Sequence, residues 1–204
     1  MELRYGILST SSIAPRFIAA VRHIQAGEIL ALSSRTLEKA QEKAALWEIP
    51  TAYGSHDELL QDERVNIVYI SNVNSQHYPW AKAALEAGKH VVCEKPCTTR
   101  EARTEELFAL AQEKGLHLGG APDTFMGAGI QTCRKLIDDG VIGDVIGAAC
   151  FMICHGHETW HPDPEFYYKF GGGPMLDMGP YYITALVNLM GGVSEVSGVA
   201  KKSF

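Results

Sequence analysis

The sequence has no apolar run of the roughly 18–20 residues that a membrane-spanning helix requires. Positive charge is also scarce, because 18 Lys and Arg stand against 24 Asp and Glu and give a formal net charge of −6. This balance argues against a nucleic acid or an anionic membrane as a partner. No signal or transit peptide precedes the first strand-like segment, so the cytoplasm is the expected location.

The chain also lacks a Cys-x-x-Cys pair. Its five cysteines form an odd, scattered set: Cys93, Cys97, Cys133, Cys150 and Cys154. Free thiols in a reducing compartment fit this pattern better than disulfides or a structural zinc site. The sequence therefore predicts no metal.

Strand-like and helical segments alternate through the first 121 residues. Strands are predicted at 3–8, 29–33, 52–53, 65–71, 90–93 and 116–118, with helices at 13–24, 37–47, 78–87 and 100–114. This alternation is typical of the α/β class with a doubly wound parallel sheet. Residues 1–121 are therefore predicted to form a Rossmann nucleotide-binding domain.

The pattern changes after Pro122. A helix around 130–137 is followed by a predicted strand at 145–153, a loop, a helix that ends near Met190 and a strand-like stretch at 193–200. Residues 122–204 are expected to form a partial α+β substrate and oligomerisation domain, with too few strands to close its open sheet.

The first strand is followed by the turn in which a dinucleotide's pyrophosphate would meet a helix N-terminus. Against the pattern G-x-G-x-x-G/A, Ser9 and Ser11 replace glycines and only Ala14 conforms. The predicted cofactor contacts here are Ser9, Thr10, Ser11 and Ile13. The alternative is that the serines only cap the helix.

The second strand ends at Ser34 and Arg35, with no carboxylate before Glu38. NAD sites usually place an acidic residue here, whereas NADP sites place an arginine nearby. A guanidinium and a hydroxyl suit a phosphate, so NADP is preferred over NAD as cofactor. The alternative is a solvated turn with an incidental arginine.

Two longer motifs carry a resemblance to a known family. Residues 84–96 read ALEAGKHVVCEKP, and residues 171–181 read GGGPMLDMGPY. They resemble the A-L-x-A-G-K-H-V-x-x-E-K-P and G-G-G-x-x-x-D-x-G-x-H signatures of the Gfo/Idh/MocA oxidoreductases. Tyr181 replaces the final histidine, as in the glucose–fructose oxidoreductase and dihydrodiol dehydrogenase branches. Asn74 and His77 match the family's P-N-x-x-H segment, although Val73 replaces its proline.

The resemblance implies an NADP-dependent dehydrogenase that transfers a hydride between nicotinamide and a secondary alcohol or carbonyl of a sugar, polyol or diol. It adds Asn74, His77, Glu94 and Lys95 to the expected cofactor contacts. Family members continue well beyond 204 residues, so the substrate domain is expected to be cut short. The chain is expected to form a homo-oligomer through its C-terminal sheet.

The chemistry of three residues suits that reaction. Oxidation of an alcohol needs a group that accepts the hydroxyl proton as the hydride leaves. Tyr181 is the predicted proton acceptor or donor, helped by the ammonium of Lys95, which also polarises the substrate oxygen. Asp177 is predicted to orient the substrate and to share a helix face with Tyr181 at i, i+4. Pro180 between them implies a kink or a late helix start.

A loop rich in histidine and aromatic residues spans 155–162. Trp160, His161 and, beyond the loop, Tyr167 suit stacking and hydrogen bonding to a polyol substrate. Plain packing and metal binding are the alternatives. For the whole chain, the alternative function is a nucleotide- or sugar-binding regulator without turnover, or an inactive remnant.

Overall fold

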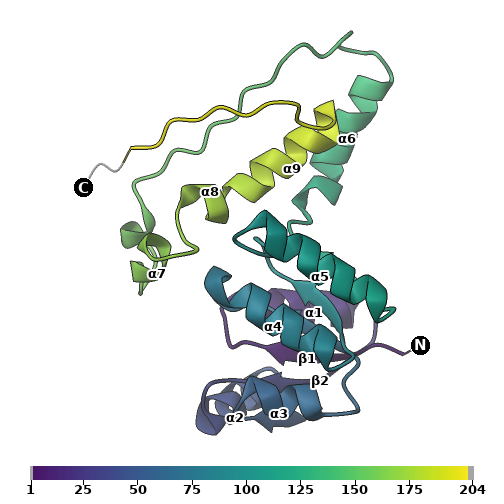
Figure 1. Cartoon of the computed structure of the whole chain (residues 1–204), viewed down its shortest axis with the longest axis vertical. Helices are drawn as coiled ribbons and strands as arrows, with labels where there is room; N and C mark the ends of the chain where they lie inside the picture. The colour runs from purple at the N-terminus through teal and green to yellow at the C-terminus, as the bar shows by residue number, and fades with distance from the viewer. Residues whose placement is uncertain (1, 202–204) are drawn as a thin grey trace. The chain divides into compact units, whose positions relative to one another are not determined.

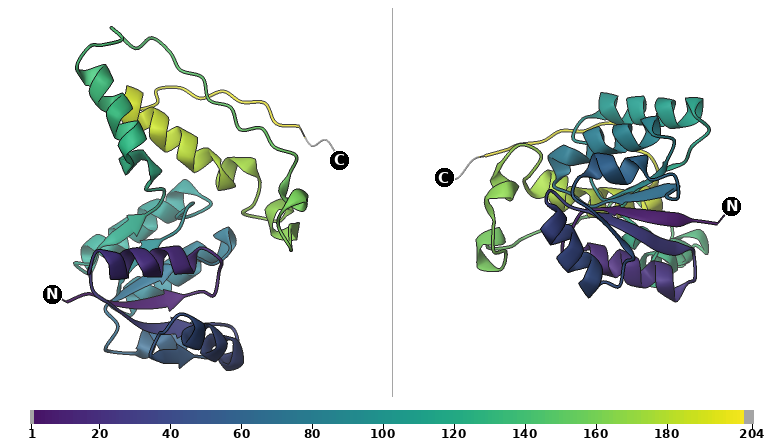
Figure 2. Two further views of the ribbon diagram at one scale, coloured as in Figure 1. Left: turned by 180° about the vertical axis from the view of Figure 1, so that it is seen from behind. Right: turned by 90° about the horizontal axis from the view of Figure 1, so that it is seen from below.

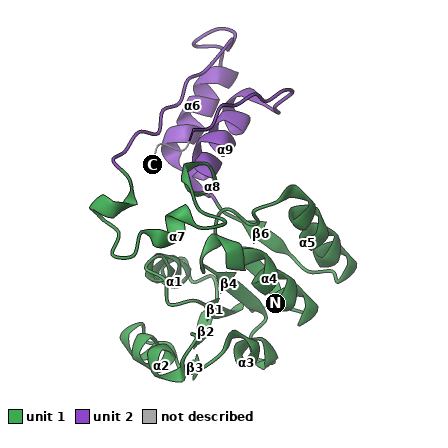
Figure 3. Ribbon diagram, turned by 60° about the vertical axis from the view of Figure 1, so that its left-hand side comes forward, with its two compact units in different colours: residues 1–121, 156–177 green, residues 122–155, 178–204 purple. Residues whose placement is uncertain are grey.

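The computed structural model describes residues 2–201, which divide into two compact units (Figure 3). The first unit comprises residues 1–121 and 156–177, and the second comprises 122–155 and 178–204. The chain therefore leaves the first unit after residue 121, returns to it for 22 residues and leaves it again. Within residues 2–201, no helix is both long and apolar enough to cross a membrane.

The first unit is built on a six-stranded sheet (Figure 1). Its strands are β1 (Arg4–Leu8), β2 (Glu28–Ser33), β3 (Thr51–Tyr53), β4 (Ile67–Ile70), β5 (His90–Cys93) and β6 (Leu118–Gly120). All neighbouring strands pair in parallel, in the order β3-β2-β1-β4-β5-β6. This order confirms the predicted Rossmann fold, in which the chain reverses its direction of winding between β1 and β4.

Helices cover both faces of this sheet, as the right-hand view of Figure 2 shows. One core cluster joins the sheet to α3 (His56–Gln61), α4 (Asn74–Glu86) and α5 (Glu101–Glu113), and the other joins it to α1 (Ala14–His23) and α2 (Leu37–Leu46). Alternate residues of β4 pack in the two clusters, so this strand is buried on both faces.

Short helical segments complete the first unit: η2 (His157–Thr159), α7 (Glu165–Tyr168) and α8 (Pro174–Asp177). Another short segment, η1 (Thr124–Met126), lies in the second unit. The second unit also contains α6 (Ala128–Asp138) and α9 (Gly179–Met190), which pack on each other. The guanidinium of Arg134 on α6 donates hydrogen bonds to the carbonyls of Asn188 and Leu189 at 3.2 and 2.6 Å, which satisfies two groups at the end of α9.

The two strands predicted for the second unit are wrong. Neither 145–153 nor the 193–200 stretch forms a strand, and both run as irregular chain. Their apolar side chains are exposed, with Ile146 and Val199 at 99% and 102%. A strand is defined by the hydrogen bonds of a paired neighbour, and sequence alternation alone does not supply that neighbour.

Candidate active site

The first candidate region is the turn after β1, at the carboxyl edge of the sheet. Ser9 is buried, and its hydroxyl donates to the carbonyl of Ser71 at 3.2 Å and accepts from the backbone N–H of Ser11 at 2.9 Å. The hydroxyl of Ser11 donates to that of Ser71 at 2.9 Å. These bonds tie the turn after β1 to the turn after β4, on the two sides of the crevice where open α/β sheets bind ligands.

The alternative that these serines cap α1 does not hold. The N-cap residue of α1 is Ile13, and it makes no side-chain cap hydrogen bond. Thr10, Ser11 and Ile13 remain partly exposed along the turn, whereas the hydroxyl of Ser9 is already engaged. The helix start with adjoining hydroxyls is a donor set that fits the pyrophosphate of a dinucleotide.

The second region is the end of β2. The hydroxyl of Ser33 and Nδ1 of His56 lie 2.7 Å apart, and the backbone N–H of Ser34 donates to the carbonyl of Tyr53 at 3.2 Å. These bonds fix the end of the strand, where Ser34 is buried and Arg35 is exposed. Arg35, the predicted phosphate contact, therefore follows a hydrogen-bonded strand end and is exposed to solvent.

The third region follows β5 and contains Glu94 and Lys95. The carboxylate of Glu94 accepts a hydrogen bond from the hydroxyl of Tyr69 at 2.7 Å. Burial, together with the bond to Glu94, raises the pKa of Tyr69 well above its ordinary value, so this phenol stays protonated. Glu94 is therefore held by the sheet, next to the predicted catalytic lysine.

Lys95 meets Asp177 although 82 positions of sequence separate them. The Nζ atom of Lys95 donates to Oδ1 of Asp177 and to its backbone carbonyl, both at 2.6 Å. The side chains are only 14% and 20% exposed, so the ion pair is shielded from most of the solvent. Both residues belong to the first unit, and the structure brings these two predicted catalytic residues together.

Tyr181 does not lie on the same helix as Asp177, which differs from the prediction. Asp177 ends α8, whereas Tyr181 lies in the first turn of α9, with Met178 as the N-cap residue between the two helices. The expectation that both share one face of a single helix is therefore wrong. Pro180 explains the break, because in the first turn of a helix its missing N–H leaves no backbone bond unmade. Of the two alternatives, the late helix start is therefore correct.

His77 supports this region from behind. Its Nδ1 lies 2.7 Å from the carbonyl of Pro96 and its Nε2 lies 2.9 Å from the carbonyl of Asn72. The residue is 1% exposed, and burial lowers its pKa while the two carbonyls oppose that shift. With both nitrogens engaged, His77 joins the connections after β4 and β5 and offers no ring nitrogen to a cofactor.

Asn74 and the glycine turn form another link within the first unit. The side-chain amide of Asn74, at the start of α4, donates to the carbonyl of Gly171 at 2.7 Å. Gly171 has φ +88°, and a side chain there would strain the backbone. The segment that contains Asn74 and His77 thus contacts the 171–181 motif, and one amide N–H of Asn74 is used within the protein.

His157 is the residue of this site that sequence reasoning missed. Its Nε2 lies 3.4 Å from Oδ2 of Asp177, and its side chain is only 6% exposed. Its ring stacks on that of Tyr167, with centroids 3.7 Å apart. Of the three histidines in this loop, the prediction named His161, because the contact of His157 with Asp177 comes from chain folding and follows no local spacing.

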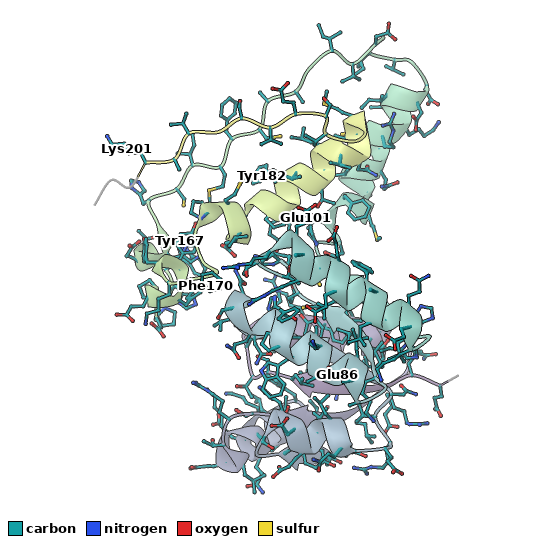
Figure 4. The ribbon with its side chains drawn as sticks, viewed as in Figure 1. Glu86, Glu101, Tyr167, Phe170, Tyr182 and Lys201 are labelled. Atoms are coloured by element: carbon teal, nitrogen blue, oxygen red, sulfur yellow. The ribbon has the colours of Figure 1, made fainter. Side chains whose placement is uncertain are left out.

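The three predicted substrate residues differ in their surroundings. Trp160 is 66% exposed, whereas Tyr167, labelled in Figure 4, is buried. Nδ1 of His161 accepts the backbone N–H of Asp163 at 3.0 Å. Trp160 and His161 therefore remain candidates for substrate contact, and the stacking of Tyr167 on His157 gives it a supporting position. Within residues 2–201, no group of three or more His, Cys, Asp or Glu side chains is arranged to hold a metal ion.

Comparison with known proteins agrees with this geometry. Residues 3–120 match the profile described as "Oxidoreductase family, NAD-binding Rossmann fold", and residues 130–204 match the "GFO/IDH/MocA C-terminal domain". The chain is 33% identical over 193 residues to trans-1,2-dihydrobenzene-1,2-diol dehydrogenase of Mus musculus and 32% identical over 194 residues to that of Homo sapiens. In each case the match covers 94% of this chain and 57% of the relative, so the chain spans little more than half of these relatives' length.

Solved structures give the same picture. A 3-ketoreductase from Actinomadura kijaniata, in complex with NADP and TDP-benzene, superposes with a TM-score of 0.84 at 30% identity, covering 94% of this chain and 58% of the other. A biliverdin reductase from Synechocystis, in complex with biliverdin and NADP+, gives a TM-score of 0.80 at 26% identity, covering 95% and 60%.

Proposed function

The chain belongs to the Gfo/Idh/MocA family of oxidoreductases, and we propose that it transfers a hydride between NADP and a secondary alcohol or carbonyl of a sugar, polyol or diol. The observation that carries this proposal is the shielded Lys95–Asp177 pair beside the carboxyl edge of a Rossmann sheet. Similar proteins that are named as dehydrogenases and reductases, two of them in complex with NADP, support it.

The residues present fit an NADP molecule. The start of α1 and the hydroxyls around it suit the pyrophosphate, and the exposed guanidinium of Arg35 suits a 2′-phosphate. The first carboxylate after β2 is Glu38, in the first turn of α2, so no acidic side chain directly follows the strand to repel that phosphate. When bound, the nicotinamide would supply the hydride chemistry.

We assign the remaining steps to this chain's own side chains. Lys95 is the group that donates a hydrogen bond to the substrate oxygen, and Asp177 fixes the direction of its ammonium. Tyr181 is the proposed proton acceptor in oxidation and donor in reduction. Residues 1–121 would bind the cofactor, 122–204 would contribute part of the substrate domain, and Trp160 and His161 would contact substrate.

Cofactor binding is tested first, by titrating NADPH and NADH and following nicotinamide fluorescence. We expect NADPH to bind more tightly than NADH. Arg35→Ala should weaken the binding of NADPH by about 10- to 100-fold, because a hydrogen bond to a charged group contributes about 1.5–3 kcal/mol. NADH binding should change little in the same variant. Equal losses for both nucleotides would contradict the proposed phosphate contact.

Turnover is tested next, by screening sugars, inositols and cyclic diols for a change in nicotinamide absorbance. Lys95→Ala is expected to lower kcat by about 100-fold or more, because general acid–base and polarising groups contribute about 10²–10⁴. Binding of NADPH without turnover of any of these compounds would contradict the dehydrogenase function and favour the alternative, a nucleotide-binding regulator. A variant at Lys95 that keeps full activity would refute the mechanism.

A further inference from the structure

Asp177 is held from two sides. Its Oδ1 accepts from Nζ of Lys95 at 2.6 Å, and its Oδ2 lies 3.4 Å from Nε2 of His157. The two partners come from different parts of the first unit, one after β5 and the other in η2. The orientation of the carboxylate is therefore set jointly by a cation and an imidazole ring.

The ring of His157 is itself tightly placed. It stacks on the ring of Tyr167 with an interplanar angle of 24°. The ring of Trp160 is also a neighbour, with its centroid 4.7 Å from that of His157. The backbone carbonyl of His157 accepts the N–H groups of Trp160 and His161 at 3.2 and 2.8 Å. Backbone and side chain are both fixed, so the ring has little freedom to leave Asp177.

The proton arrangement follows from the partners. Oδ2 of a carboxylate can only accept, so a hydrogen bond across this 3.4 Å contact requires the proton on Nε2 of His157. Its Nδ1 is buried, and within residues 2–201 it has no hydrogen-bond partner. Of the two ring nitrogens, Nε2 is therefore the one that faces an acceptor, and the geometry places the donor N–H there.

We propose that His157 is a positioning residue, which holds Oδ2 of Asp177 and thereby aims the Lys95 ammonium at the substrate oxygen. This inference rests on the proposed function. Loss of the Nε2–H donor would free the carboxylate to rotate about its terminal bond. Because small displacements of a catalytic group cost about 100-fold in rate, the effect should appear in kcat more than in KM or cofactor affinity.

Two replacements separate the donor from the ring. His157→Phe keeps an aromatic ring against Tyr167 but has no donor, whereas His157→Gln keeps an amide N–H in place of Nε2–H. We expect His157→Phe to lower kcat by about 10- to 100-fold with NADPH affinity nearly unchanged, and His157→Gln to recover most of that loss. His23→Phe, at an exposed histidine that ends α1, is the matched control and should behave as the parent protein does.

A second readout does not depend on turnover. The ¹⁵N signals of His157, assigned by their absence in His157→Gln, should show the Nε2–H tautomer in the ligand-free protein and should move in Asp177→Ala. If no substrate is turned over but these signals behave so, the proposed function fails and the positioning contact stands. An unchanged kcat in His157→Phe, or ¹⁵N signals indifferent to Asp177→Ala, would overturn the inference.

Discussion

Asp62 illustrates how one side chain sets a pH dependence. Its carboxylate accepts from Nε and Nη2 of Arg64 at 2.9 and 2.8 Å and from the hydroxyl of Tyr53 at 2.9 Å. The guanidinium of Arg64 is the main reason why the pKa of Asp62 falls from 3.8 to about 2. The carboxylate is 5% exposed and Arg64 is 57% exposed, so solvent weakens part of the pair.

We expect Asp62→Asn to lower the free energy of unfolding at neutral pH by about 1 kcal/mol, after discounting for that exposure. A depressed folded-state pKa stabilises the protein above the unfolded pKa of 3.8, and the contribution is lost as the pH falls from about 4 to about 2. The difference between parent and variant should therefore shrink over that window in urea titrations. Asp144→Asn, at an exposed position, is the control, and a difference that stays constant with pH would contradict the assignment.

Secondary-structure elements show where the sequence sufficed and where it did not. The parallel strands were predictable because a buried β4 leaves a continuous apolar run, and β5 was predicted at its observed bounds. Helix α3 was not predicted, although Ser55 and Glu58 carry a capping signal: the hydroxyl of Ser55 accepts from the N–H of Glu58 at 3.2 Å. Helix α4 begins four residues earlier than predicted, at Asn74.

The glycine turn between α7 and α8 connects two parts of the site, Tyr167 in α7 and Asp177 at the end of α8. A Cβ atom on Gly172 would lie 2.3 Å from the carbonyl oxygen of Tyr167 and 2.6 Å from that of Phe166. These are backbone atoms, so the chain must move to admit a methyl group. The residues displaced would include Tyr167, which stacks on His157, and α8, which ends at Asp177.

Gly172→Ala is therefore expected to lower kcat by about 10- to 100-fold and to expose the 156–177 segment to limited proteolysis. Gly129→Ala is the control, because a Cβ there meets open space within α6. That control should leave proteolysis unchanged and add up to about 1 kcal/mol of stability. Equal protease resistance of Gly172→Ala and the parent protein would show that the turn can adapt.

At the scale of the whole molecule, the site is assembled from segments that lie far apart in the sequence. The pairing of Lys95 with Asp177 was predictable only through the resemblance of two motifs, because their spacing carries no geometric information. The place of His157 could not be predicted at all, since a loop has no periodicity to assign its residues to a face. Long-range contacts of this kind come from the packing of the folded chain.

The last prediction concerns the second unit: 145–153 or 193–200, which form no strand within the single chain, is expected to pair with another copy of the chain. Both segments carry exposed apolar side chains, among them Ile146, Phe151, Val196 and Val199, and unpaired apolar chain favours association. A stable pairing should bury more than about 1,000 Å². Light scattering is therefore expected to show a dimer or larger assembly, with slow amide exchange in at least one of the two segments.

Lysine replacements test this pairing directly. Val196→Lys or Ile146→Lys would place a charge in the interface and should shift the mass toward the monomer, since a desolvated unpaired charge opposes association. Leu37→Lys, at a residue 49% exposed on the first unit, controls for the added charge and should leave the mass unchanged. A monomer in the parent protein with fast amide exchange through both segments would refute the pairing, because the exposed apolar residues would then have no partner copy.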